Sequence, residues 1–493
     1  MRRCLQLGSG HVKLVCYAIA VLMALAFGAS TDAYAQGYGK DKGKDGGGFF
    51  PLGQINPPAQ FPEKPTKFLS IPDLPARPKL AIEIGDPFLD TGKLDAGFEV
   101  PLLGAIWQPR LWGYFIYRTA FQTFDNGTQA ARNTEWGNRL DAFINLQLTG
   151  TEKILLNLRP LDKNRPSQFS RYSFEDARDG QGWEGEFTPD VEALFFEGDL
   201  GSLFPKLDPE GMTMLDFGFT VGRQAITFQE GILINDTIDM IGLVRNNLYL
   251  PGVSSLRISG MWGFNKIDRG LSTSDPQSFG LFTSADMPIS TVSLDMVFVE
   301  DGGGNGNAFY IGASAIQRIG LFNTAFRINN SIALDDIRGG NPGIDDGTLL
   351  TAEIAWTPFR SDDIIYFNPY ATIGKYTQAG REPIVGGPLA ALGILFASPN
   401  LSNYGAELNP FTDEVAGFAL GYQAFWDDHR RNLVLEMATR KDYSGSGVDS
   451  LGLGFQMQQA FGRHFQVQLE GFYSFVEDRD NALGARLELQ IVY

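Results

Sequence analysis

Charged side chains of both signs recur in one largely apolar segment, from Phe217 to Asn247. The set comprises Arg223, Glu230, Asp236, Asp239 and Arg245. If they faced one another across a narrow passage, two cations opposite three carboxylates would create a transverse field that orients a passing solute. The alternative is that the same residues pair with one another and neutralise charge within a protein wall. The sequence leaves both arrangements open.

Catalytic chemistry has a weaker basis in this chain. The run Asp427-Asp428-His429 is the one place where histidine and carboxylates cluster, and a hydrolytic site would need such a base beside a nucleophile or an activated water. The topology described below places this run, like His464, in a short turn, so we expect solvated turn histidines. We therefore predict that the protein is not an enzyme and has no catalytic residues.

Metal and cofactor sites are also not expected. The only cysteines, Cys4 and Cys16, lie near the N-terminus. Asp345-Asp346 and the glycine-rich stretch after Asp301 could bind Ca²⁺ weakly through clustered oxygens, but neither has the ligand spacing of a calcium loop. Turn chemistry accounts for both, so we predict no metal and no cofactor.

The N-terminus has the organisation of a secretory signal peptide. Two arginines and a lysine precede an apolar stretch from Leu14 to Ala29, and the small-x-small pattern Ala33-Tyr34-Ala35 follows it. A retained membrane anchor is the alternative, but the apolar stretch is short for a membrane span and a cleavage pattern follows. We predict that residues 1–35 are a cleaved signal peptide.

The chain is acidic. Its formal net charge is −17 and its pI is about 4.7, and loss of residues 1–35 would remove more basic than acidic side chains. Such a charge argues against a nucleic-acid partner, which requires basic surface. It favours cations around the protein.

Residues 36–109 differ in composition from the rest of the chain. A Gly/Lys/Asp run from Gly37 to Gly48 is followed by many prolines up to Pro109. Proline removes backbone donors and favours extended, poorly packed chain. We expect a periplasmic leader that acts as a disordered spacer; the alternative is a tether or partial plug that binds a periplasmic partner.

Alternating strands predict the fold of residues 110–493. In the last strand Leu487, Leu489, Ile491 and Tyr493 share one face, and charged or polar residues share the other. The longest apolar run after Ala35, Leu389 to Ala397, is about half of the roughly 18 residues that a membrane-spanning helix needs. A chain with this pattern crosses a membrane as a closed barrel, so we predict an all-β, transmembrane antiparallel β-barrel.

The links between strands provide an independent indication. Counted back from Tyr493, long and short connections alternate in phase, as expected for outside loops and periplasmic turns. The count is 18 strands with both chain ends in the periplasm. Two elements are weak, because Ile238 to Leu248 alternates poorly and Phe279 to Ala285 is short; without them the count is 16.

The C-terminal strand ending in Tyr493 resembles the closing strand and insertion signal of Gram-negative outer-membrane barrels. The strand end Gly222-Arg223-Gln224, followed by Glu230-Gly231 and an acidic strand start, is similar to porins of the alginate-export type. This resemblance implies an 18-stranded monomeric channel that passes an anionic polysaccharide along an arginine-rich lumen. The acidic composition departs from that expectation.

The predicted function is that of an outer-membrane porin. We expect passive diffusion of small hydrophilic solutes or ions, possibly export of an anionic saccharide, with outer-membrane lipid and the barrel-insertion machinery as partners. Thr377 to Glu414 is expected to fold into the mouth, because its apolar patch would be unfavourable in water. The alternative is a barrel scaffold that sheathes or docks a periplasmic or secreted partner through residues 36–109.

Overall fold

The computed structural model describes the C-terminal four-fifths of the chain. The described residues are 77, 79–89, 96–101, 103–125, 127, 132–161, 170–175, 180–185, 187–188, 191–207, 215–269, 275–302, 306–335, 344–380, 387–395, 401, 404, 408–445 and 447–493. The predicted signal peptide and the leader up to residue 76 lie outside them, as does part of the glycine-rich stretch after Asp301.

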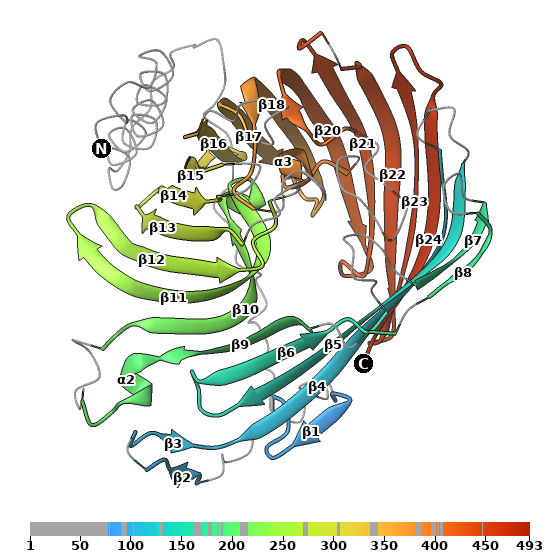
Figure 1. Ribbon diagram of the computed structural model, residues 1–493. Coiled ribbons are helices and arrows are strands. Elements are labelled where there is room, and N and C mark those ends of the chain that lie inside the picture. Colours follow the sequence, from blue (N-terminus) through green and yellow to red (C-terminus); the bar gives the residue numbers. More distant parts are fainter. Residues whose placement is uncertain are drawn as a thin grey trace, which may run out of the picture.

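Antiparallel strands form one sheet that closes on itself (Figure 1). The barrel strands are β4 (Arg110–Asp125), β5 (Asn133–Gln147), β6 (Lys153–Leu158), β9 (Val191–Asp199), β10 (Gly218–Phe228), β11 (Ile234–Leu250), β12 (Val253–Asn265), β13 (Gln277–Asp286), β14 (Ser290–Glu300), β15 (Ala308–Ile319), β16 (Phe322–Ala333), β17 (Gly347–Trp356), β18 (Ile364–Tyr376), β20 (Val415–Trp426), β21 (Arg431–Asp442), β22 (Ser450–Phe461), β23 (Phe465–Val476) and β24 (Ala482–Val492). Closure occurs where β24 pairs with β4, from Leu483↔Asp125 to Val492↔Ile116.

The structure confirms an 18-stranded antiparallel barrel. Both uncertain elements form, as β11 and β13, so the 16-stranded alternative is not the fold. Shorter segments add to the barrel: β7 (Ser170–Glu175) and β8 (Gly182–Glu184) extend it beside β5, and β19 (Thr412–Asp413) pairs with the end of β18. A four-residue helix, α2 (Leu200–Leu203), follows β9.

The two faces of each strand differ in polarity, as β24 illustrates. Leu487 is 52% exposed, whereas its neighbours Arg486 and Glu488 are buried. The buried polar face is the inner one, because its side chains contact a loop inside the barrel. Asn368 Nδ2, for example, donates to Leu392 O (2.8 Å), while the adjacent Phe367 is exposed on the other face. Apolar groups outside and polar groups inside are the arrangement that a lipid-embedded channel requires.

The poor alternation of β11 has a physical cause. Its inward residues Ile234, Ile238 and Met240 are buried in an apolar cluster with Phe282 and Tyr310. Its outward residues, including Ile241 and Leu243, are also apolar and exposed. Both faces of the strand are therefore apolar, and the polar/apolar signal is lost. A register shift between Arg245 and Leu248 interrupts the pattern further.

The long loop after β18 packs inside the barrel, as its composition predicted. Within it, α3 (Gly387–Ala390) lies inside the ring of strands (Figure 1). Leu389, Leu392 and Ile394 are buried there against inward side chains of β17, β18 and β20. The loop also reaches the barrel seam, because Gln122 on β4 donates to Leu401 O. The apolar patch is thus shielded from water by the barrel itself.

The described part of the proline-rich leader contacts the start of the barrel. Strand β1 (Ile82–Ile84) pairs with residues 111–113 of β4. The next part of β4 pairs with the C-terminus, because Phe115 and Tyr493 exchange two backbone hydrogen bonds. Asp86 adds an ion pair to Arg110 (3.1 Å). Strands β2 (Phe98–Glu99) and β3 (Ile106–Trp107) form a separate hairpin. Among the described residues, no helix is long and apolar enough to cross a membrane.

Candidate pore constriction

A turn at the tip of the β10–β11 hairpin bends into the barrel and reaches β14 and β15. The 3₁₀ turn η3 (Gln229–Gly231) contacts β15, and Gln229 Nε2 donates to Asp295 Oδ2 on β14 (2.6 Å). Gln229 and Glu230 adopt positive φ angles of 52° and 57°, a conformation that is uncommon for residues other than glycine. Such backbone strain persists where surrounding contacts hold it, and it is frequent at functional sites.

Glu230, one of the five predicted site residues, projects from this turn. Its side chain is 60% exposed, and Arg327 on β16 lies 3.8 Å from its carboxylate. The Arg327 side chain is nearly buried and makes a closer contact to Glu353 on β17. Two carboxylates therefore share one guanidinium, and the contact of Glu230 is the longer and more exposed of the two.

The inner loop supports the turn from the other side. Tyr376 Oη donates to Ile232 O (2.8 Å), Gln378 Nε2 donates to Gly231 O, and the Ala379 amide donates to Leu233 O (2.9 Å). All three bonds use backbone carbonyls of the hairpin tip. The turn is thus held between β14–β16 and the chain at and after the end of β18.

Arg223 and Asp239 lie away from this turn and pair with each other. They are direct partners in the β10–β11 register, their closest contact is 2.8 Å, and Asn265 Nδ2 also donates to Asp239 (2.8 Å). They share a sheet face with Val221 and Ile241, which are exposed. This is the pairing alternative left open by the sequence, and it occurs on the outer face. The neighbouring position 222 must be glycine, because the Cβ of any other residue there would lie 2.3 Å from Leu194 O.

The two remaining predicted residues are also separate from Glu230. Arg245 lies over the ring of Phe217 and 3.6 Å from Asp216, at the opposite end of the hairpin from η3. Asp236 points inward but is buried, and it accepts a hydrogen bond from the Asp268 amide (2.8 Å). Asp236 therefore anchors the start of the β12–β13 loop. The structure does not bring the five residues together at one place.

A row of arginines on the inner wall was not singled out from the sequence. It crosses the seam of the barrel on adjacent strands, with carboxylates between the cations: Arg159, Asp141, Arg139, Arg118, Glu488, Arg486 and Glu470. The contacts are Arg159–Asp141 (2.8 Å), Arg139–Asp141 (2.7 Å), Arg118–Glu488 (2.6 Å), Arg486–Glu470 (3.4 Å) and a close Arg486–Glu488 contact. We call this set the arginine row. Arg118 and Arg139 are direct register partners, so two like charges lie side by side.

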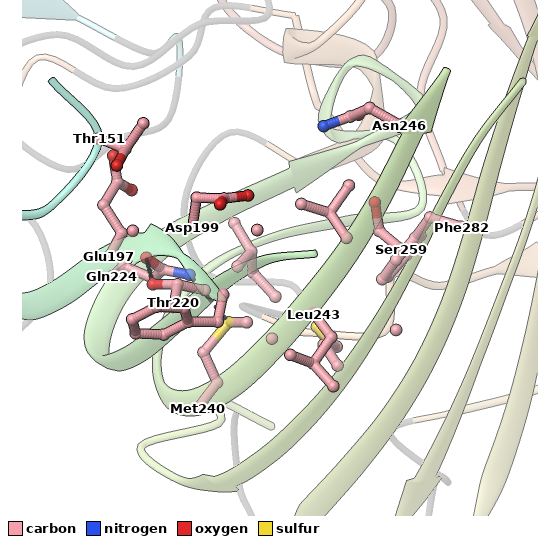
Figure 2. Close-up of a pocket in the computed structure, with 18 of the residues that line it drawn as sticks. Thr151, Glu197, Asp199, Thr220, Gln224, Met240, Leu243, Asn246, Ser259 and Phe282 are labelled. Carbon is pink, nitrogen blue, oxygen red and sulfur yellow. Dashed lines mark hydrogen bonds between the residues drawn. The ribbon is translucent and has the colours of Figure 1, made fainter. Parts of the chain in front are cut away.

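Two cavities lie along the inner side of β10–β12. The larger, of about 770 Å³, has Glu197, Asp199 and Thr220 on one side and Ser259 and Phe282 on the other (Figure 2). The smaller, of about 280 Å³, lies beside η3 and is lined by Gln229, Glu230, Arg257, Asp295 and Arg327 among others. They share Thr227, Phe228, Ser259 and Phe282 in their linings, so the two cavities are neighbours.

The histidine and aspartate clusters considered for chemistry are turn residues. His429 Nε2 lies 3.6 Å from Asp362 in an exposed contact between two turns. His464 hydrogen-bonds through Nδ1 to Val492 O (2.8 Å) and stacks on Tyr493. Asp346 accepts from the Ala333 amide, and the buried Asp301 lies 3.7 Å from Arg269. Within the described part of the chain, no three acidic, histidine or cysteine side chains are placed to hold a metal ion.

One sequence signal could have identified the arginine row. Arg139, Asp141, Arg486 and Glu488 occupy the polar face of the two strands with the clearest alternation. When a barrel strand alternates clearly, its apolar face is the lipid face, so the charged residues on its other face line the lumen. By contrast, the partners of Glu230 could not be found in this way, because Arg327 and Glu353 are remote in sequence and depend on the inward bend of the turn.

Comparison with known proteins gives a fold and no sequence relative. No protein-family model and no curated protein matches the sequence. Among solved structures, a BenF-like porin from Pseudomonas fluorescens Pf-5 matches with a TM-score of 0.54 at 9% identity, covering 78% of this chain and 98% of that chain. Pseudomonas aeruginosa OccK2 (OpdF), solved in complex with glucuronate, matches with a TM-score of 0.52 at 10% identity, covering 78% and 97%.

A third match is Pseudomonas aeruginosa OccK5 (OpdH), with a TM-score of 0.51 at 10% identity over 78% of this chain and 97% of that chain. At these identities the likeness concerns the fold. The chain has the 18-stranded barrel fold of Gram-negative outer-membrane porins.

Proposed function

We propose that this protein is an outer-membrane porin that passes small hydrophilic solutes by diffusion, with preference for solutes that carry a carboxylate. The observation that carries the proposal is the arginine row on the inner wall of a closed barrel. Three partly exposed guanidinium groups, those of Arg118, Arg139 and Arg159, give an anionic group successive positions to contact, which is how charge rings select ions in pores. The carboxylates between them keep the wall close to neutral, so an anion binds weakly enough to leave.

The finer points of location and cargo belong to the same proposal. Residues 1–35 act as a cleaved signal peptide, residues 36–109 as a periplasmic leader, and Tyr493 as the signal for the barrel-insertion machinery. Export of an anionic saccharide of the alginate type is compatible with the arginine row. The glucuronate in the OccK2 complex is a single sugar acid, and it supports small carboxylated sugars as solutes.

The test is ion conductance and selectivity of the refolded mature protein in a planar bilayer. We expect steady channels, and we expect acetate and glucuronate salts to be conducted in the wild-type chain. Substitution of Arg118 and Arg139 together by glutamine should lower the anion-to-cation permeability ratio by several-fold, because the two cations are register partners on the lumen wall. Absence of channels, or a ratio unchanged by the double substitution, would contradict the proposal.

A further inference from the structure

The smaller cavity beside η3 has charged groups of opposite sign that are open to the lumen. It is lined by residues of β10, of η3 and of the strands β12–β16. We propose that this cavity is a binding site for a small zwitterionic solute, of the size of an amino acid, on the path through the barrel. The inference rests on the proposed channel function and names a substrate class for it.

Glu230 supplies the anionic side. Its carboxylate is 60% exposed, and its ion partner among the described residues is Arg327 at 3.8 Å, a distance near the limit for such a pair. The Arg327 guanidinium lies closer to Glu353. The Glu230 carboxylate can therefore accept hydrogen bonds from the ammonium group of a solute without breaking a strong internal contact.

Arg257 supplies the cationic side. It lies on β12, lines the same cavity and is exposed, and it makes no hydrogen bond or ion pair with any residue that the structure describes. A guanidinium in this state can bind a carboxylate through two parallel hydrogen bonds. The buried Asp295, which also lines the cavity, interacts with Arg257 electrostatically, but its oxygens accept hydrogen bonds from Gln229 and from the Thr283 amide.

The lining of the cavity also includes hydroxyl groups and an aromatic pair. Ser259, Ser293 and Ser314 line the cavity from three strands. Phe228 and Phe282 stack on each other with their ring centroids 3.3 Å apart, and both also line it. Hydroxyl groups can bond to either end of a polar solute, and the aromatic pair offers a face for its carbon atoms.

The balance of charge favours a zwitterion over a simple ion. The charged residues that line the cavity are Glu230, Asp295, Arg257 and Arg327, two of each sign. A cavity without net charge gives no advantage to a lone cation or anion, but a solute with both charges gains at both ends. The volume of about 280 Å³ is below the usual range for drug-sized ligands, so it suits a single small molecule and not an oligomer.

The experiment compares three probes of similar size on the refolded mature chain in planar bilayers: L-serine, L-lactate and ethanolamine. The measured quantity is the concentration of each probe that halves the open-channel current. We expect serine to act at a concentration at least about fivefold lower than lactate or ethanolamine, because it gains charge-assisted hydrogen bonds at both ends of the cavity. Equal potency of lactate and serine would show an anion site and overturn the proposal.

Single substitutions assign the two ends. Glu230→Gln should weaken serine and ethanolamine about fivefold and leave lactate unchanged, whereas Arg257→Gln should weaken serine and lactate and leave ethanolamine unchanged. The matched controls are Glu300→Gln and Arg318→Gln, exposed residues that do not line the cavity. The exchange variant Glu230→Arg with Arg257→Glu should still respond to serine. Equal effects of a control and its test variant would contradict the assignment.

Equilibrium binding of L-serine to the refolded chain in detergent micelles, measured by calorimetry, separates this inference from the channel proposal. Serine binding that is lost in Arg257→Gln, without any conductance, would uphold the cavity and overturn the channel. Conductance without serine binding or block would overturn the cavity and leave the channel in place.

Discussion

Single residues in this barrel have different roles according to the face on which they lie. Arg223 and Asp239 are paired on the outer face of β10–β11, whereas Glu230 is exposed at the inward turn. Charge type alone therefore does not identify a lumen residue; the parity of its position along a strand does.

The position of Arg223 and Asp239 on the outer face gives a prediction for this ion pair. The double variant Arg223→Gln with Asp239→Asn should leave single-channel conductance and ion selectivity within about a tenth of the wild-type values, because neither side chain faces the lumen. Its thermal stability should fall only slightly, since partly exposed ion pairs contribute on the order of 1 kcal/mol or less. Conductance in planar bilayers and thermal unfolding followed by circular dichroism would check both, and a change in selectivity would place the pair in the pore.

The arginine row gives a second prediction at this scale. Arg486 is fully buried and lies between Glu470 and Glu488, so Arg486→Leu would remove the cation that the two buried carboxylates share, and only Glu488 would keep a second arginine contact, with Arg118. Breaking a buried pair in this way typically costs about 3–5 kcal/mol. We expect the variant to unfold at a clearly lower temperature, whereas the partly exposed Arg159→Leu should have a smaller effect. Equal loss in the two variants would contradict the role of burial.

Individual residues were the least predictable part of the molecule. The sequence indicated Glu230 as a pore-constriction candidate; in the structure it lies exposed on the turn η3, and its role in the constriction stays a prediction. The sequence could not indicate Arg327 or Arg257 as its neighbours, because those contacts depend on a turn that leaves the barrel wall. The sequence also could not indicate the role of Asp236. Its buried carboxylate accepts a hydrogen bond from the Asp268 amide, and this contact depends on the path of the loop after β12, which strand alternation does not predict.

The inner loop after β18 is the element with the largest effect on the bore. Deletion of Pro388 to Pro399 should raise single-channel conductance, because Leu389, Leu392 and Ile394 fill space inside the barrel. The strands themselves keep their pairing, so the variant should still refold. A deletion of Glu477 to Asn481, a short loop between β23 and β24, is the control. Unchanged conductance after the first deletion would remove the loop from the pore.

The leader strand β1 gives a prediction that depends on pH. The Arg77 guanidinium beside Glu83 holds the pKa of that carboxyl below its usual range, and the two groups make bonds of 2.6 and 2.9 Å. A lowered folded-state pKa stabilises the contact at neutral pH, and this stabilisation is lost as the pH falls through that pKa. Hydrogen exchange at residues 82–84 should therefore be faster at pH 3 than at pH 7, relative to β24. Glu83→Gln should remove the difference.

Elements were well predicted where one face of a strand is polar. The strands β5 and β24 follow their alternation, and the apolar loop patch correctly indicated an inward fold. Strand β11 could not be read in this way, because Ile238 and Met240 face an apolar cluster and not water. The alternation of polar and apolar residues depends on what each face of a strand contacts. Inside this barrel the inner face of β11 contacts an apolar cluster, whereas the inner faces of β5 and β24 are polar.

At the scale of the whole molecule, both termini of the barrel and the described leader meet at one edge. Strand β1 continues the ladder of β4 below Tyr493. Truncation of residues 36–101 should leave the refolded barrel conducting with unchanged unitary conductance, since β1 adds no lumen-facing strand. The measurement is the same planar-bilayer recording, with the full mature chain as control. Loss of conductance, or a channel that opens only after truncation, would support the alternative in which the leader binds a partner or plugs the pore.

The inner loop connects distant parts of the wall, and this has a mechanical consequence. It is rooted at β18, bonds to Glu436 on β21 through the Leu395 amide (2.8 Å), and reaches Gln122 on β4 through Leu401 O. A barrel with an empty interior can change from a circular to an oval cross-section under lateral force. A loop that is bonded to several strands across the interior opposes this change. Membrane tension or crowding should therefore alter the bore of this barrel little, and the rate of solute passage should be insensitive to lateral pressure in the bilayer.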